Sequence, residues 1–207
     1  MKKVSVIGLG YVGFPTALLL AKGNYKIYGF DIDTKKINSF KKKRFISQDK
    51  TLLPLVNNNK ILKNISFTKI LQPSDIYIIC VPTPINKNKS PNISFILKAI
   101  NEIAKLLKDD DLIIIQSTSP IGTTKRMYNL LSNKTDCNFS MAYCPERVFV
   151  GNTIFELRNL DRVIGGIDKQ SSHLAKNLFS KITNGKISIT NSETAEMIKL
   201  AENTYRD

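Results

Sequence analysis

The sequence predicts an α/β protein built on a doubly wound parallel sheet and followed by the start of a long helix. Short apolar runs alternate with amphipathic stretches along the whole chain. The apolar runs are continuous, as in strands buried on both faces, and a glycine-rich turn follows the first of them. Helices are therefore expected to cover both faces of one sheet.

The expected strands are short apolar runs, several of them rich in β-branched residues. In chain order they cover 3–9, 26–33, 75–84, 111–120, 139–148, 161–167 and 185–190. The first leads directly into glycines, and the second ends in acids. Pro82 and Pro84 stop the third. The fourth is again a buried run, and the last three complete the sheet.

The expected helices carry apolar residues at three- and four-residue spacing. In chain order they cover 14–23, 34–45, 94–108, 123–132, 172–182 and 192–207. Gly23 closes the first, and Ile37 and Phe40 face inward from the second. The third is strongly periodic, and its apolar face consists of Ile96, Ile100, Ile103 and Leu107.

The last helix marks the expected domain boundary. Residues 1–190 form the sheet domain, and residues 191–207 start a long central helix. Ser192 is expected to cap this helix, with Glu193 and Glu196 in its first turn.

Composition limits the class of protein. With 42% hydrophobic and 23% charged residues among 207, the chain can fill a globular core, and no run approaches the roughly 18–20 apolar residues of a membrane span. The start, MKKVSVIGLG, resembles a signal peptide only superficially because glycines interrupt it, so we expect a cytoplasmic protein. The net charge of +14 lies on scattered lysines without interleaved aromatics, which favours a solvated surface over a nucleic-acid partner.

The cysteines indicate neither disulfides nor a metal site. Cys80, Cys137 and Cys144 are odd in number and have no C-x-x-C spacing. Cys144 is expected to be buried apolar filler, the alternative being a nucleophile partnered by His173, the sole histidine. His173 itself is expected on the surface of a helix.

The turn after the first strand carries Gly8, Gly10 and Gly13 and leads straight into a helix. In a Rossmann-like fold this spacing permits a tight turn, close approach of a pyrophosphate and close helix–strand packing. Asp31, at the end of the next strand, can accept hydrogen bonds from both ribose hydroxyls and repels a 2′-phosphate, which favours NAD over NADP. Thr83 and Thr118 stand at two further strand ends and offer hydroxyls to the cofactor.

These residues resemble one family, the nucleotide-sugar 6-dehydrogenases of the UDP-glucose/GDP-mannose dehydrogenase group. The resemblance rests on GLGYVGFPTA, GFDID, VPTP, STSPIGTT, YCPERV, DRVIGG and AEMIKLAENTYRD, which occur in family order from Val4 to Asp207. AYCPERV, ELRNLDRVIGG and TNSETAEMIKLAENTYRD are most similar to the members that oxidise UDP-N-acetyl-D-mannosamine. Members acting on UDP-N-acetylglucosamine are the alternative.

The resemblance implies two hydride transfers to NAD, which take a sugar 6-hydroxyl to a carboxylate for surface polysaccharide synthesis. It implies cofactor contacts by Gly8, Gly10, Tyr11, Val12, Gly13, Asp31, Thr83 and Thr118, and substrate contacts by Arg147, Val148, Lys199, Asn203 and Arg206. It implies catalytic roles for Lys199, Glu146, Asn203 and Thr118. Lys199 would carry a proton and stabilise oxyanion character, and Glu146 would work with water.

The residues alone support these roles more weakly. Lys199 and Asn203 are four apart on one expected helix, so both can face one pocket. An ammonium beside a developing alkoxide supplies electrostatic stabilisation. The alternatives are a solvent-exposed helix lysine and, for Glu146, a loop acid paired with Arg147.

The resemblance further implies a nucleophilic cysteine in a glycine-rich loop, the remainder of a dimer-forming helix and a UDP-binding domain, all beyond residue 207. None of the three cysteines lies in such a motif. We therefore expect a truncated member of a family of homo-oligomers. The alternatives are a non-catalytic NAD-binding fragment and half of a split enzyme whose downstream partner chain carries the cysteine.

Overall fold

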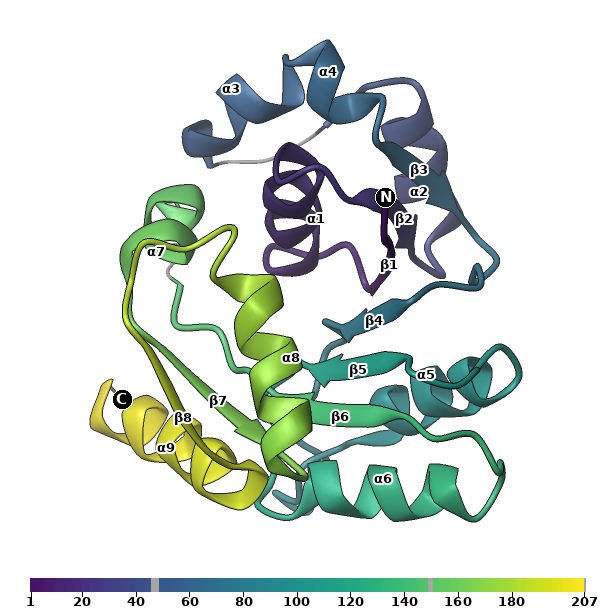
Figure 1. Ribbon diagram of the computed structural model, residues 1–207. Helices are drawn as coiled ribbons and strands as arrows, with labels where there is room; N and C mark the ends of the chain where they lie inside the picture. Colours follow the sequence, from purple (N-terminus) through teal and green to yellow (C-terminus); the bar gives the residue numbers. More distant parts are fainter. Residues whose placement is uncertain (46–48, 149–150, 207) are drawn as a thin grey trace.

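The apolar runs of the sequence form one eight-stranded sheet in a computed structural model that describes residues 1–45, 49–148 and 151–206 (Figure 1). The strands are β1 (Lys3–Ile7), β2 (Lys26–Phe30), β3 (Ile65–Thr68), β4 (Ile76–Ile79), β5 (Leu112–Ile115), β6 (Ser140–Tyr143), β7 (Arg162–Gly166) and β8 (Ile187–Asn191). Their order across the sheet is β3-β2-β1-β4-β5-β6-β7-β8.

Helices connect the strands and cover the sheet. They are α1 (Gly13–Lys22), α2 (Thr34–Lys41), the 3-10 turn η1 (Lys50–Leu52), α3 (Leu53–Val56), α4 (Asn59–Leu62), α5 (Ser94–Ala104), α6 (Thr123–Ser132), α7 (Thr153–Asn159), α8 (Lys169–Phe179) and α9 (Ser192–Arg206). The apolar residues of α1, α2 and α8 join one buried cluster, and those of α5 and α6 join another. The two clusters confirm the expected doubly wound α/β class.

One strand pair departs from the expected parallel sheet. β6 and β7 are antiparallel, whereas the other neighbouring pairs of these strands are parallel. The short helix α7 packs beside η1 and α1 instead of carrying the chain back along the sheet. β7 therefore starts at the carboxyl edge of β6 and runs in the opposite direction.

Several short elements escaped the sequence pattern. β3 was not expected, nor were η1, α3, α4 and α7, which are three to seven residues long and too short to show a helical period. The expected cap of α9 was also wrong. Asn191 Oδ1 accepts a hydrogen bond from the amide of Thr194 at 2.8 Å, whereas the Ser192 hydroxyl donates to Glu193 instead.

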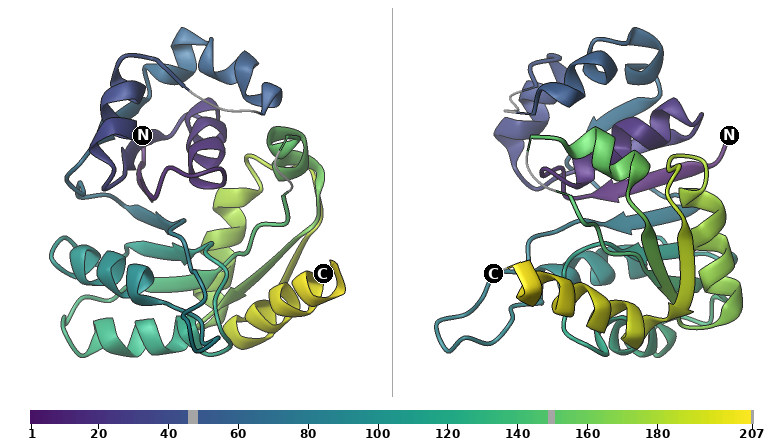
Figure 2. Two further views of the ribbon diagram at one scale, coloured as in Figure 1. Left: turned by 180° about the vertical axis from the view of Figure 1, so that it is seen from behind. Right: turned by 90° about the vertical axis from the view of Figure 1, so that its left-hand side faces the viewer.

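The strand directions place the candidate site. The carboxyl ends of β1, β2, β4, β5 and β6 share one edge of the sheet. α9 follows β8 and lies beside α6 and β7, so that its second half approaches the end of β6 (Figure 2). Within the described ranges no helix is long and apolar enough to cross a membrane.

Candidate active site

The turn between β1 and α1 requires glycine at two positions and is open at a third. A Cβ on Gly8, whose φ is +91°, would lie 2.6 Å from the carbonyl oxygen of Cys80, and one on Gly13 would lie 1.9 Å from the carbonyl oxygen of Gly8. A Cβ on Gly10 would meet nothing within 4 Å. Gly8 and Gly13 therefore serve packing, whereas Gly10 borders open space.

Three backbone amides of this turn have no hydrogen-bond partner among the described residues. In the described part of the chain, no hydrogen bond is made by the amides of Gly10, Tyr11 and Val12, and the Val12 side chain does not cap α1. Unpaired amides at a helix N-terminus, together with the helix dipole, form an anion site. The structure thus offers a cradle for a phosphate group.

Asp31 lies beside the turn at the end of β2 and is 7% exposed. Its Oδ2 accepts from the amide of Leu9 at 2.9 Å and from Lys36 Nζ at 2.8 Å, and its Oδ1 accepts from the amide of Asp33 at 2.9 Å. Burial alone would raise the pKa of Asp31, but the bonds from Lys36, Asp33 and Leu9 outweigh it and lower the pKa. Asp31 is therefore a charged acceptor. The nearby positive charge of Lys36 partly offsets the repulsion that Asp31 would exert on the 2′-phosphate of NADP.

Thr83 and Thr118 follow β4 and β5 at the same edge, and both are half-buried. The hydroxyl of Ser117 donates to the carbonyl of Val81 at 2.7 Å and so ties the two strand ends together. The sequence pattern did not single out Ser117. Its short bond brings the two threonine loops side by side.

Glu146 and Lys199 come together from segments 53 residues apart. Lys199 Nζ donates to the carbonyl of Glu146 at 2.6 Å and lies 3.6 Å from Glu146 Oε1. Lys199 is 4% exposed, so it is not a solvent-facing helix lysine. Glu146 Oε2 accepts from the amide of Val148 at 2.6 Å, which fixes the carboxylate over its own loop.

Tyr11 lies in the glycine turn and is 60% exposed. The pKa of Tyr11 is raised, first by partial burial and second by the negative charge of Glu146. The expected cofactor and catalytic residues share one edge of the sheet.

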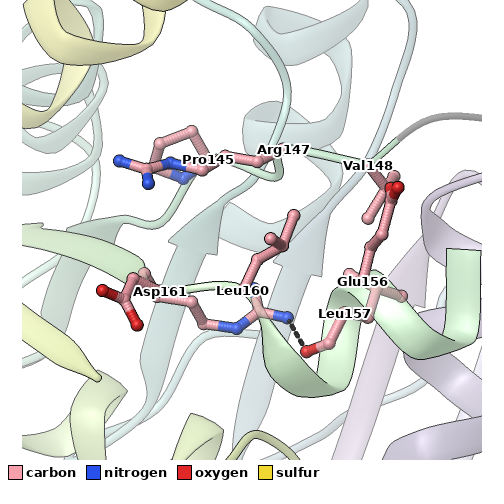
Figure 3. Close-up of a pocket in the computed structure, with 8 residues that line it drawn as sticks. Pro145, Arg147, Val148, Glu156, Leu157, Leu160 and Asp161 are labelled. Carbon is pink, nitrogen blue, oxygen red and sulfur yellow. Dashed lines mark hydrogen bonds between the residues drawn. The ribbon is translucent and has the colours of Figure 1, made fainter. Parts of the chain in front are cut away.

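The alternative interpretation, in which Glu146 is a loop acid paired with Arg147, is wrong. Arg147 Nη2 lies 2.5 Å from Glu202 Oε1 on α9, a partner that sequence reasoning did not find. Arg147 and Val148 also line a small pocket between their own loop and the turn from α7 into β7 (Figure 3). Asn203 is half-buried on α9, and the side chain of Arg206 lies outside the described residues.

The thiols of Cys144, which is buried, and of Cys80, which is half-buried, are not activated. Burial raises the pKa of Cys144 to about 11 despite the nearby Arg162, and burial followed by the charge of Glu146 raises that of Cys80. Cys144 is fully buried, as expected of filler, and His173 is exposed on α8. In the part of the chain that the structure describes, no three His, Cys, Asp or Glu side chains form a group able to hold a metal ion.

Comparison with known proteins agrees with this arrangement. UDP-N-acetyl-D-mannosamine dehydrogenase of Methanococcus aeolicus is 43% identical over 100% of this chain and 48% of its own length. NDP-N-acetyl-D-galactosaminuronic acid dehydrogenase of Ralstonia nicotianae is 36% identical over 100% of this chain and 51% of its own. The solved UDP-D-ManNAc dehydrogenase of Pyrococcus horikoshii superposes with a TM-score of 0.93 at 34% identity, over 99% of this chain and 50% of that one.

This chain therefore spans about half the length of the curated relatives that it matches. The family model for the NAD-binding domain of UDP-glucose/GDP-mannose dehydrogenases matches residues 2–183. That match covers both the glycine turn and the Pro145–Val148 loop. The chain belongs to the UDP-glucose/GDP-mannose dehydrogenase family, of which it carries the NAD-binding domain.

Proposed function

We propose that this chain binds NAD and forms the cofactor half of a nucleotide-sugar 6-dehydrogenase. The observation that carries the proposal is the set of unpaired amides at Gly10–Val12 beside the Asp31 carboxylate. The amides suit a pyrophosphate, Asp31 suits a ribose, and a Cβ on Gly10 would meet no protein atom within 4 Å. Residues 1–190 would form the cofactor domain, and residues 191–207 would start the helix toward the rest of the enzyme.

The chemistry that bound NAD would supply is the uptake of a hydride in each of two oxidations. Together they convert one CH2OH group, two NAD and one water into a carboxylate, two NADH and three protons. Lys199 is a buried ammonium whose charge would stabilise negative charge on the sugar O6 atom. Glu146, held beside it, would orient the water that the second oxidation consumes, while Asn203 and Arg147 would bind the sugar.

The proposed substrate is UDP-N-acetyl-D-mannosamine, and UDP-N-acetylglucosamine is the alternative substrate. The relatives named above act on sugars with an N-acetyl group, and those most similar in sequence include enzymes named for UDP-N-acetyl-D-mannosamine. Two competing proposals concern the chain by itself. It would be either a non-catalytic NAD-binding fragment or one half of a split, homo-oligomeric enzyme. A cytoplasmic location stays a prediction of the sequence.

Calorimetric titration with NAD and NADP tests the cofactor proposal directly. We expect saturable NAD binding and weaker NADP binding, and equal affinity for both would contradict the role of Asp31. NADH formation with UDP-N-acetyl-D-mannosamine and UDP-N-acetylglucosamine, run in parallel, tests the substrate. Steady release of two NADH per sugar by this chain alone would contradict the expectation that a further cysteine-bearing segment is needed.

A further inference from the structure

Helix α6 begins without a cap of its own. Its N-cap residue is Gly122, which has φ +85° and no side chain to accept from the first amides of the helix. Such amides require acceptors because buried backbone donors without partners are costly. The acceptor must therefore come from another part of the chain.

Glu196 of α9 supplies that acceptor from 74 residues away. Its Oε2 accepts from the amide of Gly122 at 2.6 Å. Its Oε1 accepts from both the amide and the hydroxyl of Thr124, at 2.8 Å and 2.7 Å. The side chain is 0% exposed, so its carboxylate depends on these three donors for stabilisation.

The charges around Glu196 do not include a salt-bridge partner of its own within the described residues. Glu193 lies one turn earlier in α9 with the same sign, and Lys125 of α6 pairs with Glu193 at 3.7 Å. In β6, burial and then the negative charge of Glu196 raise the pKa of the Tyr143 phenol. Burial is the main reason that the pKa of Glu196 is raised, and the bonds from α6 oppose that rise.

Two parts of the candidate site meet at this contact. On one side, the α6 start continues the loop that carries Thr118, four residues before Gly122. On the other, Lys199 follows Glu196 by three residues in α9, and its ammonium holds the Glu146 loop. Packed side chains, hydrogen bonds and rigid helical turns of this kind are the elements that carry coupling between two sites where coupling exists.

We propose that Glu196 is a positioning residue that couples the cofactor loop at Thr118 to Lys199. Through it, the binding of NAD further stabilises α9 in the arrangement that already holds Lys199 against Glu146, and removal of the Glu196 carboxylate separates the two events. This inference rests on the proposed function for what occupies the Thr118 loop. Because coupling is reciprocal, the contact between Glu196 and the start of α6 would make NAD affinity higher than in a chain that lacks the Glu196 carboxylate.

Hydrogen–deuterium exchange with and without NAD tests the coupling. In the wild type, NAD should slow exchange at the glycine turn and also at residues 196–203. In Glu196→Gln, which exchanges one acceptor oxygen for a donor, the slowing at the turn should persist while that on α9 disappears. NAD affinity should fall about fivefold or more, the usual range of such coupling.

Glu193→Gln is the matched control, because Glu193 is on the same helix and contacts the side chains of Ser192 and Lys125, whereas Glu196 accepts from the backbone amides that start α6. Thr124→Val provides a milder variant that removes only one of the three donors, should Glu196→Gln fail to fold. NAD-induced slowing on α9 that is equal in the wild type and in either Glu196→Gln or Thr124→Val would overturn the coupling alone. No slowing anywhere in the wild type would overturn the proposed function and this inference together.

Discussion

Two helices that flank this sheet begin in similar ways, but the backbone amides at their starts have different partners. α1 and α6 each follow a parallel strand through a glycine with positive φ, Gly8 at +91° and Gly122 at +85°. Neither helix is capped by the side chain of its own N-cap residue. The first amides of α6 bind the Glu196 carboxylate, whereas those of Gly10–Val12 before α1 have no partner in the described chain.

The difference shows how one local pattern serves two purposes. Every helix N-terminus attracts negative charge through its free amides and its dipole. At α6 a protein carboxylate already occupies that position, so the end is structural and is closed to a ligand anion. At α1 no protein carboxylate occupies that position among the described residues. Of the amides in this turn, Asp31 accepts a hydrogen bond from that of Leu9, at the edge of the turn. The open end is therefore the proposed phosphate site.

Gly13→Ala should break the open end most severely. Its new Cβ would lie 1.9 Å from the backbone oxygen of Gly8, which has no flexible side chain to move aside. We expect unfolding by urea to show a loss of about 3 kcal/mol or more in stability. Gly10→Ala is the control, since open space surrounds that position. Equal stability of the two variants would show that the turn is not packed as described.

Gly10→Ala should instead separate binding from stability. Its Cβ would enter the open space that a pyrophosphate needs, without touching the protein. We expect an unchanged melting temperature and an NAD affinity weaker by about 100-fold, or roughly 3 kcal/mol. Gly23→Ala, at the far end of α1, is the control, because its closest contact is 3.4 Å and it is remote from the turn. An unaltered NAD titration for Gly10→Ala would remove this turn from the site.

Asp31→Asn should weaken cofactor binding less, by about tenfold, because it keeps an acceptor oxygen and loses the charge. It also releases Lys36, whose amine would then favour a 2′-phosphate. The ratio of NADP to NAD affinity should therefore rise, as measured by parallel titrations. Asp33→Asn tests a neighbouring acid that caps α2 and touches neither Leu9 nor Lys36 Nζ. A similar change in that variant would mean that general surface charge, rather than Asp31, selects the cofactor.

The two helix starts also show what the sequence can and cannot reveal. The glycine turn and Asp31 were predictable, since turn, strand end and helix follow one another within about thirty residues and obey local steric rules. The doubly wound sheet followed from the same local patterns. The reversal of β7 did not, because it depends on where the short helix α7 packs.

The remote contacts of the site were beyond such reasoning. Glu196 looked like a first-turn acid of its own helix, yet it caps another helix 74 residues away. No sequence pattern indicated a role for Glu202, yet it pairs with Arg147. Both contacts arise because α9 returns to the carboxyl edge of the sheet, a consequence of tertiary packing alone. For Lys199, the family resemblance overcame this limit, whereas spacing by itself favoured a surface lysine.

The smallest expected effect is a difference in how stability depends on pH between Asp31, near the start of α1, and Glu196, at the start of α6. Asp31 has a lowered pKa, so the stability it contributes is present above its ordinary value of 3.8 and is lost as the pH falls through the folded value. Glu196 has a raised pKa, so its contribution is complete below its ordinary value of 4.5 and is lost as the pH rises through the folded value. Urea unfolding across this range should therefore show opposite trends. The stability gap between wild type and Asp31→Asn should shrink on acidification, and the stability of wild type relative to Glu196→Gln should improve. Parallel trends would mean that the carboxyls at the two helix starts are not in opposite environments.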